Sequence, residues 1–178
     1  HASYRRQRQM CIRDSKGTYY EIDGAINQPK PFQKPYPPLW VCGGGEKVTL
    51  KLLARHGDYG NWDVDVEGFK HKSKILQEHC KNENRDYSEI GRTLHTNVLI
   101  GKDKDDLDNK ITKLAEYTNI PKEYYYDRPL VGTKEEVFNT YAQYENEGCS
   151  YLIAYIPDII WGDTCLLYTS PSPRDSCA

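Results

Sequence analysis

The chain has 178 residues and nearly balanced charge, with 24 Lys and Arg against 26 Asp and Glu and a formal net charge of −2. No continuous basic stripe follows the sequence, which argues against binding to nucleic acid or to an anionic membrane surface. No apolar run approaches the roughly 20 residues that a membrane-spanning helix needs, and the length allows a single domain.

The two ends of the chain differ from the rest. The start contains RRQRQMCIRDS and the end contains CLLYTSPSPRD. One short DNA can encode both, because codons for MCIRDS, read on the complementary strand in another frame, give CLLYTS. Both ends also resemble translated adapters from transposase-based DNA library preparation. We therefore exclude residues 1–15 and 165–178 from the fold and expect residues 16–164 to be the natural part, a fragment of a longer protein.

Excluding the ends changes the charge and the cysteine count. Five of the 24 basic and two of the 26 acidic residues lie in the ends, so residues 16–164 carry a net charge of −5. Three of the six cysteines also lie there, which leaves Cys42, Cys80 and Cys149. An odd number of widely spaced cysteines predicts neither a disulfide framework nor a zinc site. A reduced, cytoplasmic setting is therefore expected.

Between the ends, short apolar runs alternate with helical patterns. The apolar runs predict buried strands at 37–43, 58–62, 93–101 and 151–157. Apolar residues at helical spacing predict a helix after each of the first three strands and another before the last. Continuous apolar runs that alternate with helices are typical of parallel βα units, so the sequence predicts an α/β fold with four strands.

Individual residues mark the expected ends of these helices. Gly57 is placed to end the first helix, which begins near residue 46, and Gly148 is placed to end the last. Thr133 and Glu136 have the spacing of a capping box at the start of the last helix. The stretch IPKEYYYDRP, at 120–129, is predicted to be a loop.

The most informative stretch is GTYYEIDGAINQPKPFQKPYPPLWVCGGGEKVTLKLLARHGDYGN, at 17–61. Its prolines hold the approach to the first strand extended, because each ring fixes φ and disfavours helix in the residue before it. The strand then leads through Gly43, Gly44 and Gly45 directly into the predicted helix. Glycines let the backbone come close to a ligand, and the free amides of a helix start attract phosphate.

The neighbours of the glycines can support or oppose an anion. Thr49 can offer a hydroxyl to the anion and Lys47 can add positive charge, whereas Glu46 could cap the amides of its own helix and compete with a phosphate. A tight structural turn without a ligand is the alternative. The spacing matches neither G-x-x-x-x-G-K-[ST] nor G-x-G-x-x-G, so neither of those nucleotide motifs applies.

The segment PKPFQKPYPPLWVCGGGEKVTLKLLARHGDYGN resembles the signature P-x-P-x-Q-x-P-x-P-P … G-G-x-G-E-x-x-T-L … A-R-x-x-D-x-x-N of luciferase-like oxidoreductases. It is most similar to the class that uses the deazaflavin coenzyme F420. GTYYEIDGA, the HC…NRD…EI spacing and LVGTKEEV extend the likeness over nearly all of residues 16–163. One departure is Cys42, where the family commonly has a small or apolar residue.

The resemblance implies the carboxy-terminal half, strands five to eight, of a (β/α)8 TIM barrel, whose ligands bind at the carboxyl ends of the strands. It implies that the coenzyme phosphate is surrounded by Gly43, Gly44, Gly45, Glu46 and Thr49, with Lys47 adding charge. Asn61 matches the family's asparagine near the ring system or its side chain.

The implied reaction is hydride transfer between coenzyme F420 and a small organic substrate. An FMN-dependent monooxygenase is an alternative in the same superfamily. A half-barrel that binds a phosphorylated ligand without catalysis is an alternative of another class. The catalytic residues would belong to the missing amino-terminal half, so none is assigned, and no metal is expected.

Other polar and aromatic residues allow two interpretations. His95 and Asn97 share one parity on a strand and could point into a cavity or pack in the core. The tyrosines at 124–126 could stack on a planar ligand, but packing on the barrel wall is the simpler interpretation. His79 and Cys80 favour an ordinary helix end over a metal site, because no third ligand is in register.

Four parallel strands of a barrel leave two edges unpaired, which favours association, including formation of a homodimer. The chain as written is therefore expected to be inactive by itself.

Overall fold

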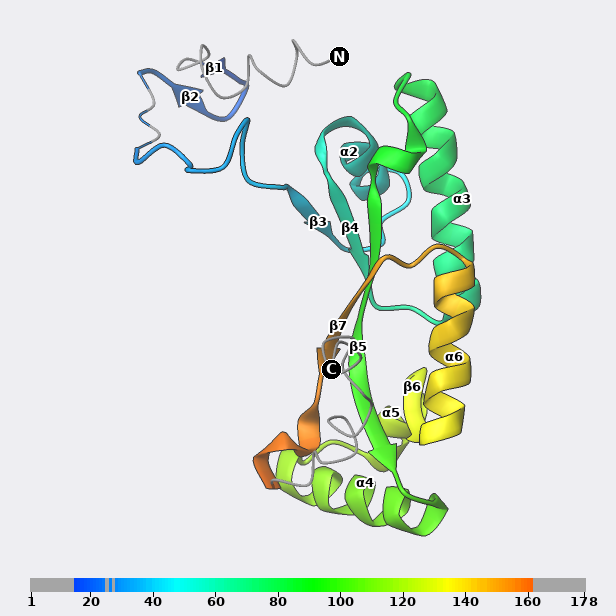
Figure 1. The fold of residues 1–178 in the computed structure, drawn as a ribbon. Helices are drawn as coiled ribbons and strands as arrows, with labels where there is room; N and C mark the ends of the chain where they lie inside the picture. Colours follow the sequence, from blue (N-terminus) through cyan, green and yellow to red (C-terminus); the bar gives the residue numbers. More distant parts are fainter. Residues whose placement is uncertain (1–14, 25, 27, 162–178) are drawn as a thin grey trace, which may run out of the picture. The chain divides into compact units, whose positions relative to one another are not determined.

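The computed structural model describes residues 15–24, 26 and 28–161, and the chain divides into two compact units, His1–Leu39 and Trp40–Ala178 (Figure 1). Apart from Ser15, the adapter-like segments lie outside the described residues. In the first unit, β1 (Ser15–Lys16) and β2 (Glu21–Ile22) pair antiparallel. The described part of the proline-rich stretch that follows forms no helix, as its composition predicts.

The second unit, as far as residue 161, is built on five parallel strands. They are β3 (Trp40–Cys42), β4 (Tyr59–Trp62), β5 (Gly91–Gly101), β6 (Leu130–Thr133) and β7 (Tyr151–Tyr155). The sheet has the order β3-β4-β5-β6, and β7 also pairs with β5. The predicted α/β fold with a parallel sheet is confirmed.

For the described part of the second unit the count of four strands was wrong by one, because β6 was not predicted; the short strands β1 and β2 of the first unit were not predicted either. Strand β6 is only four residues long, contains a glycine, and leads without a break into the next helix, so it leaves little periodic signal. It pairs with the second half of β5, at 98–101. The first half of β5 pairs with β4 and β7.

Three helices contribute to the main core with one face of the sheet, and two lie at the far end of β5 (Figure 1). The first three are α2 (Thr49–His56), α3 (Val66–Asn82) and α6 (Lys134–Asn146). The other two are α4 (Lys104–Thr118) and α5 (Lys122–Tyr126).

The main hydrophobic core lies between the sheet and helices α2, α3 and α6. Alternate residues of the strands point into it, and Trp62 and Leu94 are almost fully buried. The ring of Phe69 packs edge-to-face on both Trp62 and Tyr144, with ring centroids 5.1 and 5.6 Å apart. The Tyr144 hydroxyl donates to the carbonyl of Val64 at 2.8 Å, and burial raises the pKa of this hydroxyl.

A second hydrophobic cluster lies against the other face of β5. Leu99 packs there with residues of α4 and α5, namely Leu107, Ile111, Leu114 and Tyr125. The predicted apolar face of α4 is therefore confirmed, but the predicted loop at 120–129 was wrong in part, because it contains α5. Five residues are too few to show a helical period. Of the three tyrosines, Tyr125 is buried and its two neighbours are exposed.

The residues predicted to end the first and last helices and to cap the last one agree with the structure, although Gly57 acts for another reason. Its φ of −81° suits any residue, but a Cβ there would lie 2.6 Å from the Leu53 side chain and 2.9 Å from that of Val41. Gly148, after the end of α6, has a φ of +86°. The capping box of Thr133 and Glu136 at the start of α6 is present.

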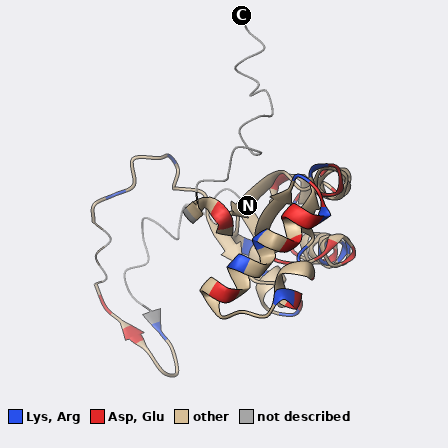
Figure 2. Cartoon of the chain, turned by 90° about the horizontal axis from the view of Figure 1, so that it is seen from below, with Lys and Arg blue, Asp and Glu red and all other residues tan. Residues whose placement is uncertain are grey.

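The described part of the second unit also contains two short 3₁₀ helices, η1 (Tyr87–Glu89) before β5 and η2 (Pro157–Trp161) after β7. Basic and acidic residues are interspersed along the helices in the view of Figure 2. Within the described ranges, none of the helices has the length and apolar character needed to cross a membrane.

Candidate functional site

The glycine turn follows the carboxyl end of β3. Gly43 has a φ of +100°, which favours glycine, and its amide donates to the carbonyl of Asn61 at 3.1 Å. A Cβ on Gly45 would lie 2.8 Å from the hydroxyl oxygen of Thr49. The turn therefore needs glycine at 43 for its backbone angle, and the absence of a Cβ at 45 leaves room for the Thr49 hydroxyl.

Helix α2 begins later than predicted. A turn at 46–48 separates the glycines from the first helical residue, Thr49, and no side chain caps the helix. The amide of Leu50 donates to the carbonyl of Gly45 at 3.0 Å. Within the described part of the chain, the amides of residues 45–49 donate no hydrogen bond, so they remain available to a ligand.

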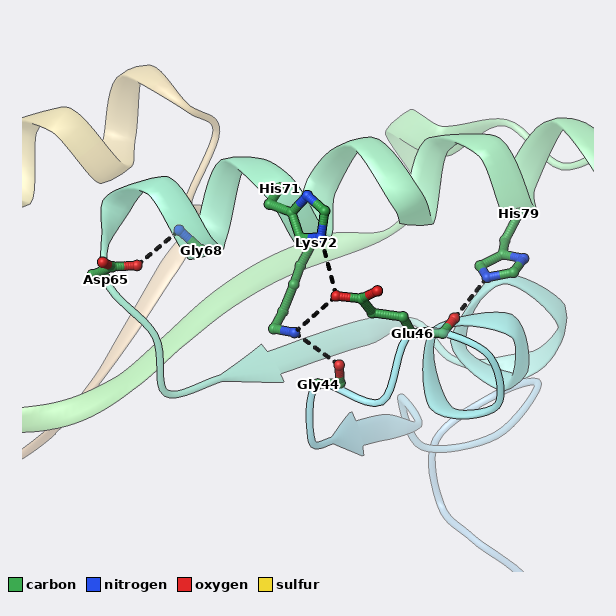
Figure 3. Close-up of polar contacts among 7 residues, drawn as sticks. All are labelled: Gly44, Glu46, Asp65, Gly68, His71, Lys72 and His79. Carbon is green, nitrogen blue, oxygen red and sulfur yellow. Dashed lines mark hydrogen bonds and ion pairs between the residues drawn. The ribbon is translucent and has the colours of Figure 1, made fainter.

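Two side chains of α3 hold carbonyl groups of this turn (Figure 3). The ammonium of Lys72 donates to the carbonyl of Gly44 at 2.8 Å. Nε2 of His79 lies 2.8 Å from the carbonyl oxygen of Glu46 and donates to it, because a carbonyl can only accept. The turn is thus fastened to α3 at two peptide groups.

The Glu46 side chain also turns toward α3. Its carboxylate lies 3.1 Å from Nε2 of His71 and 3.9 Å from the ammonium of Lys72 (Figure 3). Glu46 therefore does not cap the amides of its own helix, which was one of the two roles considered from the sequence. The Glu46 carboxylate, which could compete with an anion, instead contacts His71 and Lys72 on α3.

The remaining predicted residues divide between the turn and the sheet. Lys47 is exposed, and the half-buried Thr49 lies beside Gly45. The backbone carbonyl of Asn61 accepts from the amide of Gly43, and its side-chain amide donates to Sγ of Cys42, just before the turn, at 3.9 Å. Its side-chain oxygen accepts from the Thr93 hydroxyl at 2.9 Å, so the Asn61 side chain lies on the sheet.

The face of the sheet opposite the main core carries polar and aromatic side chains. On β3, β4 and β7, Trp40 stacks on Tyr59 with ring centroids 4.5 Å apart and meets Tyr151 edge-on at 6.0 Å. The strand register places His95 and Asn97 on this same face. No helix of the described residues buries these aromatics, since Trp40 is 41% exposed and Tyr151 is 57% exposed. We call this surface the open face.

Sequence reasoning missed the contribution of α3 to the turn. Lys72 and His79 are seven residues apart, which is about two helical turns, so they lie on one face. That spacing was visible in the sequence. What was missing was the knowledge that this face of α3 lies against the glycine turn, because that contact depends on how α2 and α3 pack together.

Comparisons with known proteins give matches only among solved structures. No family model and no curated protein matches the chain. An F420-dependent secondary alcohol dehydrogenase, solved with an F420–acetone adduct, matches with a TM-score of 0.63 and 16% identity, over 81% of this chain and 50% of that one. The riboflavin lyase RcaE, solved with modified FMN and riboflavin, matches with a TM-score of 0.61 and 14% identity, over 87% of this chain and 48% of that one.

The EDTA monooxygenase EmoA from Chelativorans sp. BNC1 matches with a TM-score of 0.59 and 14% identity, over 92% of this chain and 52% of that one. Such low identities establish the fold alone. The chain is structurally similar to F420- and FMN-dependent luciferase-like enzymes, and it spans about half the length of these relatives.

Proposed function

We propose that this chain is the carboxy-terminal half of an oxidoreductase that transfers hydride between coenzyme F420 and a small organic substrate. In this proposal the turn at 43–49 binds the coenzyme phosphate. The observation that carries it is the glycine turn at the carboxyl end of β3, whose amides at 45–49 have no partner among the described residues. Phosphate groups bind at such sites because several N–H groups converge on them.

The residues present fit a phosphate group. The absence of a Cβ at Gly45 leaves its amide open beside the Thr49 hydroxyl, and that hydroxyl can donate to the same oxygen atoms. Lys47 is exposed next to these groups and can add charge. When bound, the deazaflavin supplies the hydride chemistry. The protein's part is to hold the coenzyme and to present the open face, with Asn61, His95 and Asn97, toward the reacting ring.

FMN is the second candidate coenzyme. Its support is the riboflavin lyase structure, which holds modified FMN and matches this chain almost as well as the F420-dependent enzyme does. Both coenzymes carry a phosphate, so the glycine turn suits either of them. In this version the complete enzyme would be a flavin-dependent monooxygenase.

Coenzyme binding tests the proposal. The purified chain, and the same chain extended by its upstream reading frame, are titrated with F420 and with FMN while coenzyme fluorescence is followed. Binding of one coenzyme, weakened by Gly45→Val, supports the proposal. Failure of both coenzymes to bind the extended protein contradicts it. Binding without turnover of any tested alcohol or aldehyde supports the non-catalytic half-barrel instead.

A further inference from the structure

The two carbonyls that α3 holds belong to alternate peptide groups of the turn. Lys72 binds the carbonyl of Gly44, and His79 binds the carbonyl of Glu46. Both donors are well placed, with distances of 2.8 Å, and the Lys72 side chain is only 15% exposed. A nearly buried lysine with a backbone partner has few other conformations available.

Peptide geometry then decides where the next amides point. The peptide bonds 44–45 and 46–47 are trans, since the cis bonds of the described residues precede Pro29 and Pro35. In a planar trans peptide the C=O and N–H groups point in opposite directions. The amide of Gly45 therefore points away from Lys72, and the amide of Lys47 points away from His79. Both amides face away from the groups on α3 that hold their carbonyls.

We infer that Lys72 and His79 are positioning residues, which aim the Gly45 and Lys47 amides at the anion by holding the opposite ends of the same peptide groups. This inference rests on the proposed function, because it assigns these two residues to the phosphate-binding turn. Their action is indirect, and neither side chain needs to touch the anion. Hydrogen bonds to the two carbonyls also polarise the peptide groups and strengthen their N–H donors.

Glu46 and His71 complete this arrangement. The Glu46 carboxylate lies between His71 and Lys72, where it contacts the His71 ring and partly balances the charge of Lys72. This contact keeps the carboxylate on the α3 side of the turn (Figure 3). A negative side chain that lies next in sequence to both proposed anion contacts, between Gly45 and Lys47, is thereby held away from them.

The test uses the whole chain, labelled with ¹⁵N, and inorganic phosphate as the probe at constant ionic strength. Amide spectra are recorded during the phosphate titration for the wild type and for Lys72→Met, His79→Leu and His79→Gln. The matched control is Lys74→Met, which removes the same charge from an exposed position on the same helix. Each variant is first checked for folding by its amide spectrum.

We expect the wild-type amides of Gly45 and Lys47 to shift with phosphate. In Lys72→Met the Gly45 response should be lost, and the dissociation constant should rise about tenfold, as for loss of a hydrogen bond to a charged group. His79→Leu should remove the Lys47 response, and His79→Gln, whose amide can still donate, should restore part of it. Lys74→Met should behave as the wild type.

Two other outcomes overturn the inference. If phosphate shifts the turn amides equally in the wild type, Lys72→Met and His79→Leu, the positioning role is wrong and the proposed function stands. If phosphate shifts no turn amide in the wild type, the proposed site and the positioning role both fail. If Lys72→Met does not fold, the amide shifts of His79→Leu and His79→Gln during the phosphate titration decide between these outcomes.

Discussion

Gly43 and Gly45 serve the same turn for different physical reasons. Gly43 has a positive φ, which side-chain-bearing residues rarely adopt, while Gly45 has an ordinary φ and a near neighbour, the Thr49 hydroxyl. The first requirement concerns the stability of the turn. The second concerns space beside an amide that has no partner among the described residues.

Substitutions at the two glycines should therefore separate stability from binding. Gly43→Ala should lower the free energy of unfolding by about 1–2 kcal/mol, the usual cost of placing a side chain at positive φ. Gly45→Ala should change stability less, because the Thr49 hydroxyl can rotate, yet weaken phosphate binding. Urea unfolding and phosphate titration of both variants check this. Equal stability of Gly43→Ala and wild type would contradict the account.

At the level of single residues, the sequence predicted the glycine turn but not its support. Three glycines after an apolar run are a local signal, and so is Thr49 four residues further on. The pairing of Glu46 with α3, and the carbonyl contacts of Lys72 and His79, join residues that lie 25 to 33 positions apart. No local pattern encodes such contacts.

Helix α3 carries Lys72 and His79, which hold the glycine turn. The stability of the amino-terminal end of α3 therefore matters for the proposed site. The carboxylate of Asp65 accepts from the amide of Gly68 at 2.8 Å and caps the helix (Figure 3). A side-chain cap satisfies one of the free amides at a helix start. The start of α3 is thereby held in place before the residues that reach the turn.

Removal of this cap should destabilise the protein. We expect Asp65→Ala to lower the free energy of unfolding by about 1 kcal/mol, a typical cost for a lost N-cap. Asp65→Asn keeps a capping oxygen and is the control. Thermal or urea unfolding measures both variants, and a loss in Asp65→Asn equal to that in Asp65→Ala would show that charge rather than capping matters.

Helix α6 begins with a capping box that titrates. The Glu136 carboxylate accepts hydrogen bonds from Lys104 and from the amide and hydroxyl of Thr133, and these contacts lower its pKa from 4.5 to about 2. A depressed pKa in the folded state means that ionised Glu136 favours folding above the unfolded pKa. This contribution is lost as the pH falls through the folded value.

The acid stability of the chain should therefore depend on Glu136. Wild-type stability should decline between about pH 4.5 and pH 2 partly because Glu136 becomes protonated, and Glu136→Gln should show a smaller decline over that range. The difference between the two proteins should shrink toward pH 2 and vanish only below the folded pKa of Glu136, which is about 2. Urea unfolding at several pH values measures this, and parallel curves for the two proteins would count against the role of Glu136.

Elements with a long periodic pattern were predictable, and short ones were not. The burial of Leu107, Ile111 and Leu114 in α4 follows from their helical spacing. Helix α5 and strand β6 have five and four residues, too few to repeat any pattern, and they form because tertiary packing favours them. Tyr125 and Leu130 are buried in the two hydrophobic clusters, which supplies that packing.

At the scale of the whole molecule, the open face exposes apolar rings that most soluble proteins would cover. Tyr151 and Tyr155 on β7 are 57% and 62% exposed, and Trp40 lies on the opposite edge strand. Exposed apolar surface beside sheet edges favours association. We propose that two copies of this chain can associate through this face when no other segment covers it.

Sedimentation over a range of protein concentrations tests this proposal. The wild type should show a mass above that of the monomer as concentration rises, and Tyr151→Lys/Tyr155→Lys should shift it toward the monomer. Phe138→Lys, on the exposed side of α6, is the control, since Phe138 is 71% exposed but lies away from the open face. A wild type that stays monomeric throughout would refute the proposal.

Strand β5 links both hydrophobic clusters. Leu94 and Val98 point into the main core, Leu99 points into the smaller cluster, and the strand pairs with β4, β6 and β7 along its eleven residues. Fraying of either cluster would loosen a backbone segment on which the other depends. The two clusters should therefore melt cooperatively, and their hydrogen-exchange protection should collapse together rather than in two stages.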